Sequence, residues 1–139
     1  MKIVADIMTR EVLTLRPDAP VEQAALELIL RGIHGAPVED VEGRVVGVLS
    51  TTGLLASGGG RDVSDAMAPV LFAVMDTDHA LYAAKRMLET GTHRVVVLNA
   101  SGKLVGVVSP MDVMAAVLEG EDLHAGWEAW QADARDGQK

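Results

Sequence analysis

The feature that most constrains the fold of this chain is an internal duplication. Residues 2–60 align with residues 61–119 without a gap, and 14 of the 59 aligned positions carry the same residue. Gly47 matches Gly106 and His34 matches His93 at one constant offset. An uninterrupted repeat of this length indicates two copies of a single structural unit. We therefore expect the domains to be residues 2–60 and residues 61–119, followed by a C-terminal tail at residues 120–139.

Both copies predict the same order of elements: strand, helix, strand, strand, helix. In the first copy these are a strand at 12–15, a helix at 21–30, strands at 36–40 and 44–50, and a helix from residue 51. In the second copy the strands are 71–74, 94–99 and 103–109, the first helix ends at Gly91, and the second helix begins at Pro110. Glycine turns at residues 42–43 and 101–102 join the strands into hairpins.

Local signals mark where the helices begin and end. The first helix stops at Gly32, and we expect Asp18 to cap its start with Pro20 in its first turn. Ser109 is the expected cap of the helix that begins at Pro110. The glycine run at residues 58–60 marks the seam between the two copies.

These elements predict an α+β fold in which the two copies depend on each other. Neither copy alone can cover both faces of its three-stranded sheet. We expect the copies to stack sheet to sheet with pseudo-twofold symmetry. Such stacking creates two related clefts between the repeats, and a cleft of this kind is a common place for a small ligand.

Composition and charge limit the class of function. Lys and Arg total 12 against 20 Asp and Glu, and the resulting net charge of −8 argues against a nucleic-acid-binding protein. The chain has no cysteine, and its 4 histidines lack metal-site spacing, so we expect no bound metal. The absence of phosphate-loop, dinucleotide and nucleophile-elbow motifs predicts a binding module, not an enzyme. Without a signal peptide or an apolar run of ~20 residues, a cytoplasmic protein is expected.

Two segments of the chain resemble the CBS domain family. They are ADIMTREVLTLRPDAPVEQAALELILRGIHGAPVEDVEGRVVGVLS in the first copy and VSDAMAPVLFAVMDTDHALYAAKRMLETGTHRVVVLNASGKLVGVVSPMDVM in the second. Together they resemble a tandem CBS pair, or Bateman module, over residues 2–119. The resemblance implies a regulatory module that binds AMP, ADP, ATP or S-adenosylmethionine between the repeats and requires no cofactor. It also implies a homodimer and a regulated partner protein that the sequence does not identify.

The resemblance assigns the ligand motif of the family to Gly106–Asp112. It implies that Asp112 binds the ribose, and a carboxylate suits this role because it can accept hydrogen bonds from both hydroxyls of a diol. Ser109 would cap the following helix or donate to the ligand. The same two residues also fit a plain S-x-x-D capping box, and this alternative stays open.

The resemblance also suggests phosphate and adenine contacts. Arg94 and His93 precede the middle strand of the second copy, where a basic side chain would reach ligand phosphates. A solvent-exposed arginine and a packed histidine are the alternatives. The adenine wall would come from the first copy, although each of its residues also suits the core: Val12, Leu13, Ile33, His34, Gly35 and Pro37.

The two clefts are not expected to be equivalent. At the positions of Asp112 and Arg94 the first copy has Gly53 and Gly35. The cleft around Ser50 and Gly53 is therefore expected to be a degenerate second site, empty or weakly occupied.

The tail carries both tryptophans of the chain. Leu123, Trp127 and Trp130 are spaced to share one helical face. This face would dock against the module itself or form a dimer or partner surface. The second possibility supports an alternative function, in which the protein is an interaction module that binds no ligand and uses the Trp-bearing tail.

Overall fold

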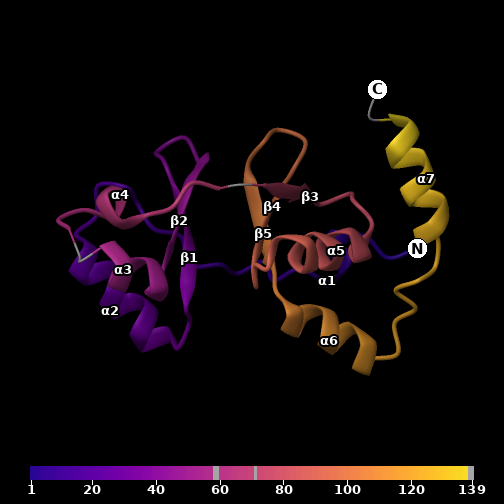
Figure 1. Ribbon diagram of the computed structural model, residues 1–139, viewed down its shortest axis with the longest axis horizontal. Coiled ribbons are helices and arrows are strands. Elements are labelled where there is room, and N and C mark those ends of the chain that lie inside the picture. Colours follow the sequence, from indigo (N-terminus) through magenta and orange to yellow (C-terminus); the bar gives the residue numbers. More distant parts are fainter. Residues whose placement is uncertain (58–59, 71, 138–139) are drawn as a thin grey trace. The chain divides into compact units, whose positions relative to one another are not determined.

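The structure is a computed structural model that describes residues 1–57, 60–70 and 72–137 (Figure 1). It confirms the α+β class. The elements in chain order are α1 (Val4–Ile7), α2 (Val21–Arg31), β1 (Gly35–Glu39), β2 (Val45–Ser50), α3 (Thr51–Ser57), α4 (Val63–Ala66), β3 (Ala73–Met75), α5 (Ala80–Thr90), β4 (Val95–Leu98), β5 (Leu104–Val108), α6 (Pro110–Leu118) and α7 (Trp127–Gly137). Gly58 and Gly59 of the expected seam and Leu71 of an expected strand lie outside the described residues.

The chain forms two compact units, each built from parts of both sequence copies. Unit 1 comprises Met1–Arg10, Phe72–Ser101 and Val105–Lys139, and unit 2 comprises Glu11–Leu71 and Gly102–Leu104. The segment that opens each copy, which we call its leader, therefore packs with the other copy. Residues 1–10 join unit 1, and the leader of the second copy, residues 61–70, joins unit 2.

Unit 2 is built on an antiparallel hairpin of β1 and β2 covered by α2 and α3. The expected strand at 12–15 is reduced to one parallel bridge between Leu15 and Val38. The Leu15 N–H donates to the Pro37 carbonyl (3.0 Å), and the Glu39 N–H donates to the Leu15 carbonyl (2.9 Å). The next bond of a parallel ladder would require an N–H on Pro37. Because proline has none, the ladder ends there and Val12 and Leu13 stay outside a regular strand.

The start of α2 differs from the sequence prediction. Asp18 does not cap the helix; Pro20 is the N-cap residue and no side chain bonds to the first turn. Instead, the Val21 N–H donates to the carbonyl of Arg61 at 2.9 Å. The leader of the second copy thus supplies the acceptor that a capping side chain would otherwise provide. The end of the helix is as predicted, with Gly32 at φ 65°.

Unit 1 contains a three-stranded sheet in the order β3, β4, β5, with β3 parallel to β4. The strand expected at 71–74 is observed at Ala73–Met75. Seven buried side chains form the core of this unit: Val74, Val95, Val97, Val108, Ala83 and Met87 of α5, and Val4 of the leader. α6 begins as predicted, with Pro110 in its first turn and the Ser109 side chain as its cap.

Each leader contains a one-turn helix that the sequence analysis missed. In α1 the Ile3 N–H donates to Asp6 (2.9 Å), and in α4 the Asp62 N–H donates to Asp65 (3.0 Å). The leaders also explain a glycine in the repeated motif. A Cβ on Gly106 would lie 2.7 Å from the sulfur of Met8 and 2.8 Å from the carbonyl of Thr9. Gly47 has the equivalent relation to residues 67 and 68, so both copies need glycine where a leader crosses the last strand.

The C-terminal tail is part of unit 1 and packs against its other elements. Leu123 is buried against Ala80 and Ala116, and the Trp130 ring lies 5.1 Å from the Tyr82 ring. Leu123 precedes α7 and is separated from it by Gly126 at φ 77°, so the expectation that it shares a helical face with the tryptophans is wrong. Among the described residues, no helix combines the length and apolar character needed to cross a membrane.

Candidate functional site

Ser109 and Asp112 form a capping box at the start of α6. The backbone N–H of Ser109 donates to Asp112 Oδ2 at 2.8 Å, and the Ser109 hydroxyl lies 3.2 Å from the same oxygen. In return, the Asp112 N–H lies 3.4 Å from the Ser109 hydroxyl. The capping interpretation of this pair is therefore correct. It does not exclude ligand binding, because the carboxylate is only half-buried.

Thr9 is a third member of this site that the sequence analysis missed. Its hydroxyl donates to Asp112 Oδ1 at 2.8 Å across 103 residues of sequence. Its backbone pairs with Val107 on β5 at 2.9 and 3.0 Å, which fixes the side chain beside the carboxylate. The duplication contained a signal for this residue, since the position of Thr9 in the second copy is occupied by Ala68.

Arg94 lies at the same edge of the sheet as this cluster. In unit 2, Gly35 and Ser50 are directly opposite each other in the hairpin ladder. Their equivalents in unit 1 are Arg94, which directly precedes β4, and Ser109, which directly follows β5, and these two strands are neighbours in the sheet. Arg94 is half-buried, and burial lowers the pKa of its guanidinium from the usual value. It remains a cation at neutral pH. His93 precedes it and is exposed.

The equivalent edge of unit 2 retains the helix cap and lacks the hydroxyl, the guanidinium and the carboxylate. The Ser50 hydroxyl accepts the Gly53 N–H at 2.9 Å. The positions equivalent to Thr9, Arg94 and Asp112 carry Ala68, Gly35 and Gly53. Both partners of the Thr9–Asp112 hydrogen bond are therefore absent together.

Comparison with known proteins identifies the family. Residues 4–58 and 63–119 each match the CBS domain. The chain belongs to the CBS domain family. Its two matched segments make it a CBS pair, as the sequence analysis predicted.

Relatives of this CBS pair include a structure with a bound nucleotide. The crystal structure of CBSX2 in complex with AMP has a TM-score of 0.81 and 31% identity, and the match covers 86% of this chain and 98% of that one. CBSX2 is a protein of Arabidopsis thaliana.

Curated relatives are longer than this chain. The chloroplastic CBSX1 of Arabidopsis thaliana is 28% identical, over 84% of this chain and 64% of its own length. A 17.7 kDa protein of Acidianus ambivalens is 26% identical, over 84% of this chain and 73% of its own length. The CBS pair thus spans about two thirds of these relatives.

The residues expected to face adenine all belong to unit 2. Leu13 and Ile33 pack against its core, and Gly35 and Pro37 are buried in β1. Val12 is half-buried. His34 is exposed, and its carbonyl accepts the Thr51 N–H at 2.9 Å. Packing therefore accounts for the first four positions, and their contact with a ligand stays a prediction.

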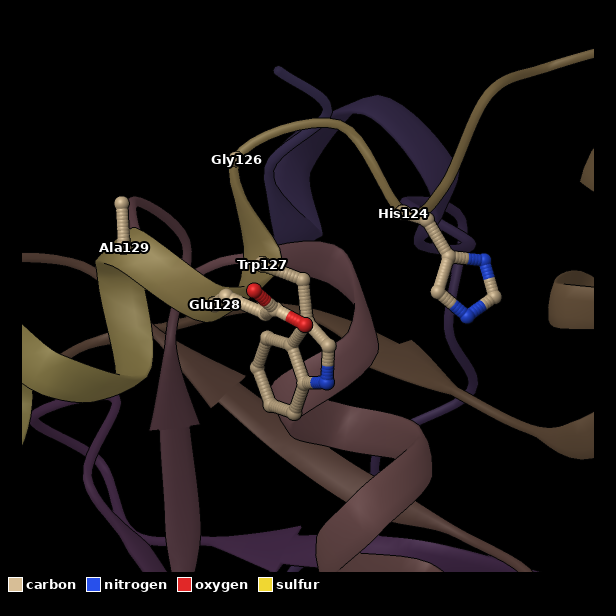
Figure 2. A pocket seen from close by; sticks show the side chains of 5 residues that line it. All are labelled: His124, Gly126, Trp127, Glu128 and Ala129. Carbon is tan, nitrogen blue, oxygen red and sulfur yellow. The ribbon is translucent and has the colours of Figure 1, made fainter.

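A hollow of about 280 Å³ lies on the tail (Figure 2). It is lined by His124, Gly126, Trp127, Glu128 and Ala129. Four of these residues are exposed and only Trp127 is half-buried. The hollow contains none of the predicted site residues.

The pKa of the Asp78 carboxyl is raised above its usual value in the folded protein. Burial raises the pKa of its carboxyl and the charge of Asp76 raises it further, while the bond from the Met75 N–H (2.8 Å) acts in the opposite direction. An acid with a raised pKa in the folded state binds protons more tightly there than in the unfolded chain. Stability is therefore gained as pH falls through that pKa and lost as pH rises.

Asp78→Asn is expected to be more stable than the wild type at neutral pH. The amide oxygen can still accept the Met75 N–H, and no charge is buried. Urea unfolding at several pH values should show the advantage shrinking as the solution becomes acidic. An advantage that did not change with pH would mean that the charge of Asp78 is not its cause.

Proposed function

We propose that this CBS pair is a regulatory, non-catalytic module that binds an adenosine-containing ligand, with the ribose on Asp112. The observation that carries this proposal is the asymmetry between the repeats. Both repeats retain the serine that caps the last helix, which is the structural requirement. Only one retains the carboxylate and the hydroxyl that bonds to it. A capping role alone gives no reason for this difference, since Ser50 caps α3 without a carboxylate.

The hydrogen bonds of Asp112 leave room for a ligand and suggest how it is accepted. Oδ2 receives two donors from Ser109, and Oδ1 receives one from Thr9. With two lone pairs on each oxygen, one acceptor position remains on Oδ1. A ribose diol requires a second position. We expect the Thr9 hydroxyl to rotate and bond to the sugar, because its backbone is held separately by Val107.

Arg94 and His93 are proposed to bind the ligand phosphates. Arg94 is a cation on the same sheet edge as the ribose site, and its planar group matches phosphate oxygens. The six apolar and backbone positions of unit 2 remain the proposed adenine contacts. The relative CBSX2 has been crystallised with AMP, which supports an adenine nucleotide as the first ligand to test.

Isothermal titration calorimetry with AMP, ADP, ATP and S-adenosylmethionine tests this function. We expect saturable binding of at least one of them with one ligand per chain, because unit 2 lacks the equivalents of Thr9, Arg94 and Asp112. The absence of both a binding heat and a thermal shift with all four ligands would contradict the proposal. A stoichiometry of two would contradict the asymmetry.

A second candidate is an interaction module that binds no nucleotide. It is favoured by the internal hydrogen bonds of Asp112, which are sufficient for a structural role, and by the tail. Trp127 and Trp130 are only half-buried and stack at 5.8 Å, and tryptophan is enriched at protein interfaces. A negative calorimetric screen together with a partner whose binding requires these two side chains would establish this alternative.

A homodimer is also proposed, with α6 as its contact. This short helix exposes a large apolar surface, made up of Met111, Met114, Val117 and Leu118. Met114→Glu and Leu118→Glu should shift the chain to a monomer in analytical ultracentrifugation. Leu26→Glu, at an exposed apolar position of α2, is the control for a new charge placed outside α6. A wild-type monomer at high concentration would refute the dimer.

A further inference from the structure

The first residues of the chain are held by the C-terminal tail and the start of α5. The Lys2 ammonium lies 3.0 Å from the carboxylate of Glu121, and the Lys2 carbonyl accepts the Ala80 N–H at 3.0 Å. The Val4 N–H donates to the Asp78 carbonyl at 2.8 Å. A Cβ on Gly126 would lie 3.2 Å from the Met1 side chain, which shows how closely the tail approaches the N-terminus. Figure 1 shows this end of the chain beside the start of α7.

The other end of the same leader reaches the proposed ligand site. Thr9 pairs with Val107 through its backbone and donates its hydroxyl to Asp112. Residues 5–8 separate Thr9 from the contacts that Lys2 and Val4 make with the rest of the unit. Val4 is fully buried, so this one-turn helix is anchored in the core. Thr9 is thus held by Val107 on β5 and also belongs to a segment whose beginning the tail helps to hold.

A buried cluster makes a second connection between the tail and Asp112. Leu123 of the tail belongs to one buried cluster with Ala116 of α6 and Ala80, and Ile7 of the leader packs against this cluster. Asp112 lies in the first turn of the same helix α6, and its neighbour Val113 also contacts the cluster. The tail, the leader and the helix that carries the ligand carboxylate therefore share one packing unit.

His79 joins the tail to α5. Its ring is completely buried, its Nδ1 accepts the Leu81 N–H at 3.1 Å, and its Nε2 lies 2.8 Å from the Ala125 carbonyl. Because Nδ1 is an acceptor here, the proton is on Nε2 and is donated to the tail. The Trp127 ring lies 5.1 Å from the imidazole, and Figure 2 shows this residue at the start of α7.

From these contacts we infer that docking of the tail, residues 120–137, is coupled to occupancy of the Asp112 site through the leader at residues 1–9. The part of this inference that concerns ligand binding rests on the proposed function. A ligand that uses Asp112 and Thr9 binds the state in which the leader is seated. The tail stabilises the same state, so the ligand favours the docked tail, and loss of docking weakens the ligand by the same factor.

The two tryptophans make this coupling directly measurable. Trp127 and Trp130 are the only tryptophans of the chain, so its tryptophan fluorescence reports on the tail alone. Titration of AMP into the full chain should change this fluorescence. The change should reach half of its maximum at the AMP concentration that half-saturates the protein in calorimetry. Leu123→Ala and Gly126→Ala should loosen the tail and weaken AMP binding about tenfold, within the usual range of coupling between sites. Leu88→Ala, at an exposed position on α5, should change neither.

A ligand-free measurement tests the coupling separately from the proposed function. Thr9→Val removes the hydroxyl that bonds to Asp112, and we expect amide exchange at residues 121–130 to become about threefold faster, as the loss of one hydrogen bond allows. Thr52→Val, an exposed threonine of unit 2, is the matched control. If wild-type protein does not bind AMP, the proposed function fails for that ligand. The amide-exchange measurement still tests the coupling between the leader and the tail. Unchanged exchange in Thr9→Val overturns the coupling, as does unchanged AMP affinity in tail variants whose fluorescence shows an undocked tail.

Discussion

Replacing Asp112 with Ala should weaken AMP binding to this CBS pair about 100-fold. The carboxylate is proposed to accept hydrogen bonds from the ribose hydroxyls, and a bond to a charged group contributes about 1.5–3 kcal/mol. The loss of two such bonds, partly offset by water, corresponds to about two powers of ten in affinity. Calorimetry at fixed ionic strength measures this ratio.

The same substitution removes a helix cap, so its effect on stability must be separated from its effect on binding. Loss of the bonds from Ser109 should lower the free energy of unfolding by about 1 kcal/mol. Asp65→Ala is a matched control because Asp65 accepts the N–H groups of Arg61 and Asp62 in the capping box of α4, which is of the same kind. It should reduce stability similarly and leave AMP affinity unchanged. An equal loss of affinity in both variants would assign Asp112 to capping alone.

The parts of the fold that depend on neighbouring residues were predictable from the sequence. Gly32 and Gly91 end their helices at φ 65° and 69°, and Gly43 and Gly102 form the hairpin turns at φ 81° and 79°. These conformations follow from the absence of a side chain and need no knowledge of the rest of the chain. The duplication then extends each assignment from one copy to the other.

The exchange of the leaders could not be predicted in this way. Residues 1–10 and 61–70 carry the same pattern, so either segment suits either copy by its own residues. Only the packed structure shows that each leader joins the other copy. The prediction that Asp18 caps α2 is wrong for the same reason, since Arg61 of the exchanged leader provides the acceptor for Val21.

The sequence predicted only part of the candidate site. Comparison of the repeats singled out Asp112 and Arg94 because their counterparts are glycines. Thr9 was missed although Ala68 replaces it in the same comparison, because nothing local places a residue of the first copy beside the last helix of the second. The structure thus adds Thr9 to the polar side chains that only one repeat carries, which supports the proposal of a single ligand site.

Replacing His79 with Phe should lower the free energy of unfolding by about 2–4 kcal/mol. Phenylalanine keeps a flat ring beside Trp127 and makes neither hydrogen bond of the imidazole. The Leu81 N–H and the Ala125 carbonyl would each lose a partner, and an unsatisfied buried group costs about 1–3 kcal/mol. Urea unfolding followed by circular dichroism measures the difference. A change below about 0.5 kcal/mol, typical of surface substitutions, would show that water replaces both bonds.

His124→Phe provides the control, because His124 lies on the same tail with an exposed ring and should tolerate the change. The urea concentration at which the tail of His79→Phe undocks also shows how the tail is attached. If tryptophan fluorescence changes at lower urea than circular dichroism, the tail undocks before unit 1 unfolds. The lost stability then belongs to the tail contact, and AMP affinity should fall in this variant without global unfolding. Coincident transitions would instead make His79 part of the cooperative core of unit 1.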